Sequence, residues 1–371
     1  MSDDVYCSMI HGGLDINLKE GAGIINHCCL RQDKYPIDFA NPWRNDKMMH
    51  LRSVNRANTW DKGCGNCQSL EKVGLESMRQ GMNSGLKING RTDLTGPARL
   101  DLLFDISCNL ACRTCGTHSS TFWQKHLKEH GEWSGPVVAS RDKDRMIELL
   151  SALNLENLQQ VVFCGGETLL GQSYWDIAKW LTDNVPNAKH QLIIGFQTNG
   201  TQPIDKKNYD IIERCYLTKL HVSLDGVGEQ FEYLRWPALW HQVQDNLLQL
   251  RTELPSNVMF LVEQTISIFN VLYLKQLDNW CTDNFSTNRE GDPIDSTKHL
   301  AKGIYGLHNC SEKLVRELSE TKHHNLIPGN WKENDLSIRL MLAQIKKFDQ
   351  FRNQSFEKTF PATFAAFKEF W

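Results

Sequence analysis

The sequence feature that most constrains the fold is a regular alternation of strand-like and helix-like segments between residues 99 and 307. Short runs rich in apolar and β-branched residues predict strands, and the stretches between them carry apolar residues at helical spacing. Strands joined by helices form parallel βαβ units, because parallel neighbours need a long crossover connection. Six units in succession predict a partial β/α barrel, whose functional site lies at the carboxyl ends of the strands.

The pattern places the predicted elements in strict alternation. The predicted strands are residues 99–105, 159–164, 191–198, 219–224, 258–268 and 303–307. The predicted helices are residues 119–130, 141–153, 172–184, 205–214, 240–250 and 272–283. We therefore predict an α/β fold with a partial (β/α)6 TIM-like barrel over residues 91–310.

Two further regions flank this barrel. Residues 1–90 hold five cysteines among many Gly, Asn and Asp residues, which predicts a small loop-rich domain that bound ligands hold together. Residues 311–371 predict a helical extension with an aromatic tail, which we expect to pack on the barrel or on the first region.

Composition excludes several classes of protein. The 371 residues are 40% hydrophobic, and 41 basic against 44 acidic residues give a net charge of −3, so nothing indicates nucleic-acid binding. No apolar run approaches a membrane span, and the N-terminus lacks the pattern of a signal peptide, so we expect a cytoplasmic protein without membrane association. Twelve cysteines are too few for a small secreted disulfide scaffold, and their clustering indicates metal binding.

The most informative cysteines are Cys108, Cys112 and Cys115, which follow the first predicted strand with C-x3-C-x2-C spacing. A four-iron cluster normally takes four cysteines, so three leave one iron open to a ligand other than protein. Zinc is the alternative from the residues alone, since His118 could be a fourth ligand.

This loop after a first strand resembles the cluster loop of the radical S-adenosylmethionine (SAM) enzymes. In that family the open iron chelates SAM, and an electron from the cluster cleaves SAM to methionine and a 5′-deoxyadenosyl radical. The resemblance implies a [4Fe-4S] cluster and SAM as cofactors. The aromatic residue usual before the third cysteine is replaced by Thr114, which weakens adenine stacking at this position.

The second predicted strand ends in a Gly-Gly-Glu motif, which follows Cys164. The pair Gly165 and Gly166 lets a ligand approach the backbone closely, and the carboxylate of Glu167 can accept a hydrogen bond from an ammonium group. The matching motif of radical SAM enzymes binds the amino group of SAM.

Thr-Asn-Gly, Ser-Leu-Asp-Gly and Thr-Ile-Ser segments fall at the ends of the next three predicted strands. By resemblance, Asn199 contacts SAM, Ser223 binds its carboxylate or ribose, and Thr265 lines the adenine pocket. The resemblance also makes Asp225, nearer the substrate, and Arg235, which could pair with a carboxylate, the expected catalytic residues. An ordinary turn explains the Asp-Gly pair equally well.

The N-terminal region offers four more metal ligands, namely Cys7, Cys28, Cys64 and Cys67. Four thiolates can close around one cubane or one zinc ion. The pattern resembles the twitch or SPASM auxiliary-cluster domains of radical SAM enzymes, although most of those follow the barrel. Cys29 could replace Cys28. A fully ligated site leaves electron transfer, substrate docking or stability as its role.

The resemblance implies a two-cluster radical SAM enzyme that abstracts hydrogen from a substrate C–H bond and takes electrons from a reductant such as flavodoxin or ferredoxin. A peptide or protein substrate is the first expectation, and a small molecule or nucleotide sugar is the alternative. A non-enzymatic protein with two zinc sites is disfavoured, because a zinc staple does not need the motifs at the strand ends.

Overall fold

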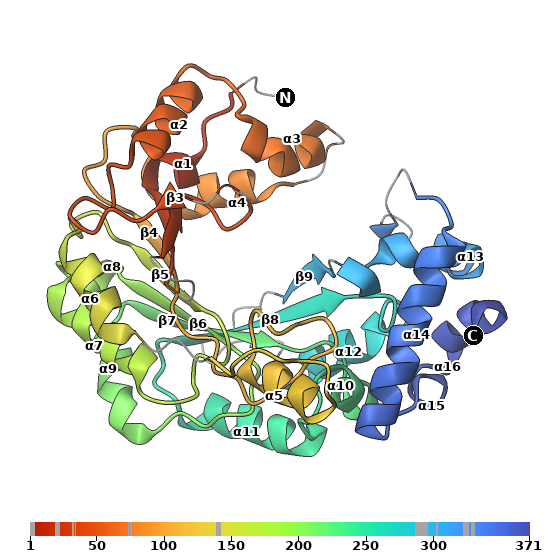
Figure 1. Cartoon of the computed structure of the whole chain (residues 1–371). Helices are drawn as coiled ribbons and strands as arrows, with labels where there is room; N and C mark the ends of the chain where they lie inside the picture. Colours follow the sequence, from red (N-terminus) through yellow and green to blue (C-terminus); the bar gives the residue numbers. More distant parts are fainter. Residues whose placement is uncertain are drawn as a thin grey trace.

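The computed structural model describes residues 4–18, 23–31, 33, 35–72, 74, 76–138, 142–285, 296–301, 303–321, 326–327 and 331–371. Its described strands form one curved sheet in the order β3-β2-β1-β4-β5-β6-β7-β8-β9 (Figure 1). The α/β class and the partial barrel are thereby confirmed.

The sheet is antiparallel at its N-terminal edge and parallel elsewhere. β2 pairs antiparallel with β1 and with β3, whereas the pairs from β1–β4 through β8–β9 are all parallel. Their bounds are β1 (Gly13–Asn17), β2 (Ile24–Asn26), β3 (Tyr35–Pro36), β4 (Arg99–Leu103), β5 (Gln160–Cys164), β6 (Ile193–Thr198), β7 (Leu217–Ser223), β8 (Val258–Ile266) and β9 (Ser296–Leu300).

Helices follow the parallel strands and cover the outer face of the sheet (Figure 1). Those of the barrel are α5 (Thr121–Glu129), α6 (Lys143–Ser151), α7 (Ser173–Asn184), α8 (Ala188–Gln191), α9 (Tyr209–Glu213), α10 (Gly228–Leu234), α11 (Trp240–Glu253) and α12 (Leu274–Phe285), with 3₁₀ helices η2 (Lys206–Asn208), η3 (Gly303–Tyr305) and η4 (Leu307–Asn309). Short polar side chains begin several of them, as where the Ser120 hydroxyl accepts from Trp123 N at the start of α5.

Side-chain alternation along the strands sets which residues face the barrel interior. In β7 and β8 every second residue is buried, among them Leu220, Val222 and Phe260. These residues join the main hydrophobic core with the outer helices. Ser223 and Thr265, at the carboxyl ends of the same strands, belong to the other, half-buried face.

The sheet continues into the N-terminal region, which the sequence analysis expects to be rich in loops. β1 pairs parallel with β4, and Leu14 and Ile16 are buried in the same core as Leu100. The helices here are α1 (Ser8–Gly12), α2 (Asp46–Arg56), α3 (Gly65–Lys72) and α4 (Met78–Gly85), with 3₁₀ helix η1 (Lys62–Cys64). The domain limits 1–90, 91–310 and 311–371 stay predictions.

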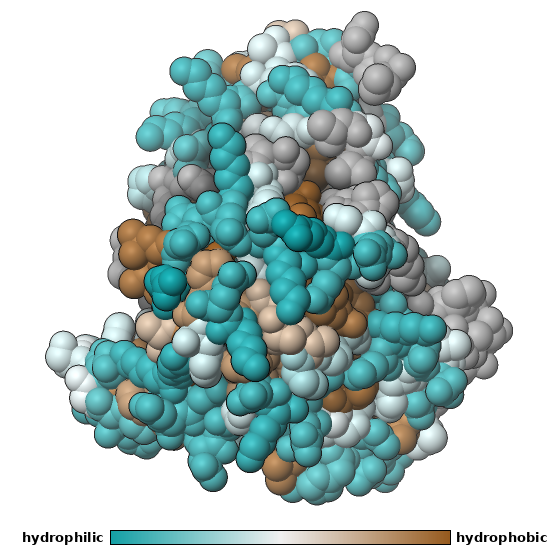
Figure 2. Space-filling model, turned by 90° about the vertical axis from the view of Figure 1, so that its right-hand side faces the viewer, coloured by the Kyte–Doolittle hydropathy of each residue, from teal (hydrophilic) through white to brown (hydrophobic). Residues whose placement is uncertain are grey.

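The C-terminal extension is helical, as predicted. It comprises α13 (Glu312–Ser319), α14 (Asp335–Arg352), α15 (Phe356–Thr359), α16 (Pro361–Phe367) and 3₁₀ helix η6 (Lys368–Phe370). Phe356, Phe360 and Phe367 are fully buried in a second hydrophobic core, which also holds Phe269 of the barrel. The face on which α13 and α14 lie is mainly hydrophilic, with scattered hydrophobic patches (Figure 2).

One predicted strand is wrong. Residues 303–307 form η3 and the start of η4, and the sixth parallel strand of the barrel is β9 instead. The exposed Lys298, His299 and Leu300 of β9 lie at the edge of the sheet, so its sequence lacks the apolar alternation that marks a half-buried strand. None of the described helices is long and apolar enough to cross a bilayer.

Candidate active site

The three barrel cysteines lie on one loop, residues 104–120, which we call the cluster loop. Cys108, Cys112 and Cys115 line a common cavity of about 440 Å³, which we call the first cavity. The segment after α10 holds this loop in place. Ala111 N donates to Trp236 O at 2.8 Å, and Arg113 N donates to Leu234 O at 2.7 Å. The loop after β4 therefore brings the three thiols to one cavity.

Hydrogen-bond donors surround two of these sulfurs. Leu110 N lies 3.5 Å and Asn199 Nδ2 lies 3.9 Å from Cys108 Sγ, and Arg235 Nη1 lies 3.9 Å from Cys112 Sγ. Burial raises the pKa of Cys108 to about 11 and that of Cys112 further. A bound metal would reverse this effect, since a coordinated thiol is deprotonated, and the donors would stabilise its negative charge.

The donor set fits an iron–sulfur cluster. Three thiols with amide and guanidinium donors beside them match the cysteine ligation of such clusters and the hydrogen bonds that their sulfurs accept. Among the described residues, no group of three or more His, Cys, Asp or Glu side chains is placed to hold a metal ion. The fit therefore rests on the chemistry of the donors and on the cavity that they share.

The Gly-Gly-Glu turn after β5 packs against the cluster loop. Gly166 N donates to Asp105 O and Glu167 N to Ser107 O, at 3.2 and 2.7 Å. A Cβ on Gly166 would lie 2.0 Å from Ser107 O, and Gly165 has a φ of +112°. The glycine pair is thus needed for the turn to approach the loop, and both glycines line the first cavity.

The carboxylate of Glu167 joins the ends of β5 and β6. It accepts from Asn199 N at 2.6 Å, from Thr198 Oγ1 at 2.8 Å and from Leu169 N at 2.9 Å. Glu167 is 1% exposed, and burial raises its pKa. Its side chain holds the β6 end in place and does not line the first cavity.

Asn199 connects β6 to the cluster loop. Its Nδ2 donates to Asn109 Oδ1 at 2.9 Å, while its Oδ1 accepts from Thr201 N and Thr201 Oγ1 at 2.9 and 2.6 Å. Asn109 Nδ2 in turn donates to Thr201 Oγ1 at 2.8 Å. This closed network fixes the Asn199 side chain on the cavity wall, beside the first cysteine.

Asp225 and Arg235 form a buried ion pair, with 2.9 Å between Oδ2 and Nη2. Asp225 Oδ1 also accepts from Thr265 N at 2.8 Å, and Asn270 Nδ2 donates to the Asp225 carbonyl at 2.8 Å. Burial alone would lower the pKa of Arg235, but the charge of Asp225 raises it. Arg235 lines the first cavity, whereas the carboxylate of Asp225 is turned toward the arginine and β8.

The first cavity gathers most of the sequence-predicted residues and adds others. Ser223 and Thr265 line it with the two glycines, Asn199 and Arg235. Thr114, His118, Cys164 and Gln197 also line it. From the sequence, Thr114 stood out only as the position of a missing aromatic residue and His118 only as a possible zinc ligand, and neither Cys164 nor Gln197 was assigned a role. Cys164 and Gln197 could have been predicted as wall residues, because both lie near the carboxyl ends of predicted strands.

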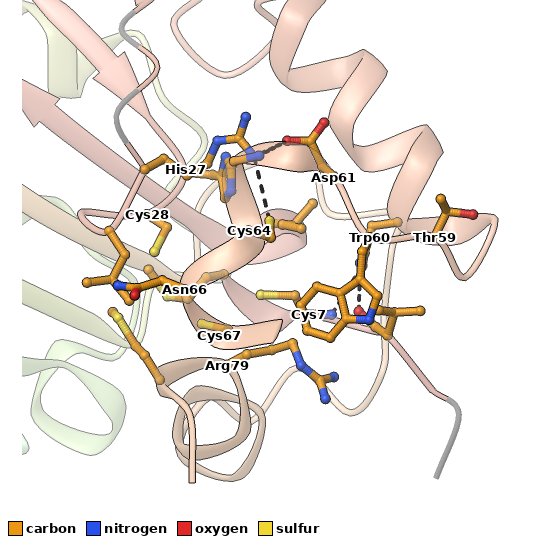
Figure 3. Close-up of a pocket in the computed structure, with 18 residues that line it drawn as sticks. Cys7, His27, Cys28, Thr59, Trp60, Asp61, Cys64, Asn66, Cys67 and Arg79 are labelled. Carbon is orange, nitrogen blue, oxygen red and sulfur yellow. Dashed lines mark hydrogen bonds and ion pairs between the residues drawn. The ribbon is translucent and has the colours of Figure 1, made fainter. Parts of the chain in front are cut away.

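The N-terminal cysteines surround a separate cavity. Cys7 precedes α1, Cys28 follows β2, Cys64 ends η1, and Cys67 belongs to α3, yet all four line this cavity (Figure 3). Cys29 does not line it. Burial raises the pKa of Cys7 to about 11, although the amides of Met9 and Ile10 act in the opposite direction. A four-thiol set of this kind fits one cluster or one zinc ion.

Arginines brace this N-terminal site. Arg79 forms a bidentate pair with Glu71 at 2.6 and 2.9 Å and donates to Tyr6 O at 2.6 Å, so it ties α3 and α4 to the segment that carries Cys7. Arg31 pairs with Asp61 and lies 3.6 Å from Cys64 Sγ. Sequence reasoning missed the role of Arg31, since no spacing rule connects it to the cysteines.

One family model matches part of the barrel. Residues 106–267 match the model of the radical SAM superfamily, from the cluster loop to the end of β8. The match covers less than half of the chain and shows similarity to radical SAM domains over the barrel. No curated protein matches the chain.

Solved structures of two proteins match the chain at low identity and low TM-score. Native anSMEcpe with bound AdoMet and Cp18Cys peptide has a TM-score of 0.37 and 16% identity, covering 69% of this chain and 61% of that one. Streptococcus suis SuiB bound to S-adenosylmethionine has a TM-score of 0.35 and 11% identity, covering 94% and 72%. This chain thus spans about three fifths of the length of anSMEcpe.

Proposed function

We propose that the cluster loop holds a [4Fe-4S] cluster through Cys108, Cys112 and Cys115, and that SAM occupies the first cavity. The observation that carries this proposal is the convergence of the three thiols with four later strand ends on that single cavity. A cluster bound there supplies the electron that cleaves SAM reductively to a 5′-deoxyadenosyl radical, which takes hydrogen from a substrate C–H bond. The residues of the chain orient SAM and exclude water from it.

Each wall residue has a role in this arrangement. The backbone of Gly165 and Gly166 receives the amino group of SAM, with Glu167 positioning the adjoining β6 end. Asn199 and Ser223 supply polar contacts to SAM, and Thr265 lines the adenine pocket. Arg235, held in place by its ion pair with Asp225, points a guanidinium donor at Cys112, and Asp225 is the residue nearer the substrate.

A second metal centre in the N-terminal region belongs to the same proposal. Cys7, Cys28, Cys64 and Cys67 hold a second [4Fe-4S] cluster, of the twitch or SPASM type, and zinc is the alternative. Cys28 is favoured over Cys29 because it lines the cavity. Such a closed site serves electron transfer, substrate docking or stability, with flavodoxin or ferredoxin as the external reductant.

The proposed substrate is a peptide or protein, as the resemblance to enzymes with auxiliary clusters indicates. A small molecule or nucleotide sugar is the second candidate, and the near-neutral charge of the chain suits both.

The test is anaerobic reconstitution followed by counting of iron and sulfide and by assay of 5′-deoxyadenosine from SAM with dithionite. About eight irons per chain support two cubanes, and about four support one. Cys112→Ala should abolish 5′-deoxyadenosine formation, whereas the matched control Cys281→Ala, which packs on the main core, should retain it. A reconstituted wild type that forms none, or a Cys112→Ala protein as active as the wild type, refutes the proposal.

A further inference from the structure

Arg352, the last residue of α14, is a buried cation that has no carboxylate partner among the described residues. It is 6% exposed, and its Nε donates to His126 Nε2 at 3.3 Å. In the part of the chain that the structure describes, its Nη1 and Nη2 have no hydrogen-bond partner. Burial, followed by the charge of Arg352 itself, lowers the pKa of His126 to about 4, so this imidazole is neutral near pH 7. A buried charge is costly without a counter-charge, so we expect one close by.

The rings that enclose Arg352 also hold the cluster loop. Its guanidinium carbon lies 4.6 Å from the centre of the Trp123 ring and 4.9 Å from that of Trp236. Trp123 Nε1 donates to Cys112 O at 2.9 Å, and Trp236 O accepts from Ala111 N at 2.8 Å. By each route, a single tryptophan lies between Arg352 and the backbone that carries the second cysteine of the loop.

Two other arginines beside the cluster loop already have counter-charges. They form the pairs Arg113–Asp349, at 2.5 Å, and Arg235–Asp225, at 2.9 Å. Asp349 also precedes Arg352 by about one helical turn, but its carboxylate is engaged by Arg113 and by two further donors. Glu167, another buried carboxyl group near the loop, interacts electrostatically with Arg235. The carboxylates around the loop thus leave the charge of Arg352 unbalanced.

The sulfur of Cys112 is the remaining source of negative charge. Burial, followed by the charge of Arg113, lowers the pKa of Arg352 to about 9, so its guanidinium stays charged near pH 7. Negative charge on Tyr305, Cys112 or Tyr233 would stabilise it. Both tyrosines stay neutral, because burial raises their pKa values. A thiol bound to iron is deprotonated, so Cys112 supplies negative charge once it binds a metal.

We propose that Arg352 is the counter-charge of the iron–sulfur cluster on the cluster loop, and that it raises the reduction potential of that cluster. Reduction adds a negative charge, so a nearby cation stabilises the reduced state more than the oxidised state. The interaction acts through space across the indole ring of Trp123, so the buried Nη1 and Nη2 need no contact with a ligand. Arg352 is therefore a positioning residue for charge and not a catalytic one. The inference rests on the proposed function, because that function places the cluster on this loop.

The test is an anaerobic redox titration of the reconstituted full-length protein, followed by electron paramagnetic resonance. The signal of the barrel cluster is identified as the one that Cys112→Ala lacks. Arg352→Gln and Arg352→Met each remove the charge. In both variants we expect the ratio of reduced to oxidised barrel cluster at a fixed potential to fall about tenfold, which is a shift of about 59 mV to more negative potential.

The pair of variants separates charge from packing. Glutamine keeps a hydrogen-bond donor for His126, whereas methionine keeps apolar contact with the rings, so a packing role would affect the two differently and a charge role shifts both alike. The matched control is Arg339→Gln, because Arg339 is exposed on the same helix, about 20 Å away along its axis, and its loss should leave the potential unchanged. A potential equal to that of the wild type in either folded Arg352 variant overturns the proposal, so one folded variant is enough to decide it.

The two proposals fail in different ways. A protein that cleaves SAM but whose barrel cluster has the same potential with and without Arg352 keeps the proposed function and loses this inference. A protein whose potential falls in both variants but that forms no 5′-deoxyadenosine keeps this inference and loses the proposed cleavage of SAM. A wild type that binds no iron through Cys112 loses both.

Discussion

Arg113 of the cluster loop and Asp349 of α14 are 236 residues apart in the sequence and form a buried ion pair of 2.5 Å. The Arg113 guanidinium also lies 4.0 Å from the centre of the Tyr233 ring, whose hydroxyl donates to Asp349 at 2.8 Å. Asp349 Oδ2 accepts from Phe356 N at 2.7 Å. The C-terminal extension therefore supports the loop that carries the three cysteines, in addition to covering the barrel.

Removal of this charge pair should destabilise the protein strongly. Asp349→Asn leaves the Arg113 guanidinium buried without a counter-charge, so we expect a loss of about 3–5 kcal/mol in the free energy of unfolding. Chemical denaturation of the metal-free chain measures it. The control is Asp183→Asn, which breaks exposed pairs with Lys179 and Arg214 and should cost less than about 1 kcal/mol. Equal losses in the two variants would show that the buried pair is not a support of the loop.

The local sequence pattern predicted the barrel strands better than it predicted β1 or the ion pair that holds the cluster loop. β4 to β8 were found because apolar runs of strand length alternate with amphipathic helices, and the polar motifs at their ends then fell on one edge of the sheet. β1 was missed because its five residues lie in a region of loops, and its partner β4 comes more than eighty residues later. The Arg113–Asp349 pair had no local signal at all, since neither residue belongs to a periodic pattern that points to the other.

The Gly-Gly-Glu turn makes contacts that the sequence did not predict. Sequence reasoning assigned the glycines to close approach by a ligand, and the structure adds a close approach by the cluster loop itself. The carboxylate of Glu167 accepts three hydrogen bonds from protein groups, of which two lie on another strand end. The residue types alone do not show whether such a carboxylate accepts its hydrogen bonds from a ligand or from a neighbouring strand.

Gly166→Ala should damage the cluster loop directly. The added Cβ would lie 2.0 Å from Ser107 O, a backbone atom that cannot move without displacing the residue before Cys108. We expect loss of iron from the barrel site and a lower melting temperature. Gly85→Ala is the control, because its Cβ meets no atom within 4 Å at the end of α4. Iron content equal to that of the wild type in Gly166→Ala would contradict this account.

The buried carboxyl of Asp15 should make stability depend on pH. Burial, followed by the charge of Asp101, raises its pKa to about 7, although Arg99 opposes the shift, and Cys29 and Cys164 are also within electrostatic range. The unfolded value is about 3.9, so between about pH 4 and pH 7 the folded state keeps a proton that the unfolded state has released. Stability should therefore fall as pH rises through this window and level off above it.

Asp15→Asn isolates that contribution. The amide cannot ionise, so the variant should lose less stability than the wild type between pH 5 and pH 8, with a difference of about 2 kcal/mol. Thermal unfolding of both proteins in matched buffers across this range measures it. Parallel pH profiles for the two proteins would mean that Asp15 does not titrate in the window.

The adjacent cysteines Cys28 and Cys29 provide a matched test of the N-terminal metal site. Only Cys28 lines the cavity with Cys7, Cys64 and Cys67, although the two residues are neighbours in the chain. Cys28→Ser should remove about four irons per chain after reconstitution if the site holds a cubane, or about one zinc if it holds zinc. Cys29→Ser should change neither count, and the barrel cluster should survive in both variants because its three ligands lie on a separate loop.

Elemental analysis, with iron and zinc measured on the same sample, separates the outcomes. Metal loss in Cys29→Ser with full metal in Cys28→Ser would assign the ligand to Cys29 and require the segment after β2 to turn the other way.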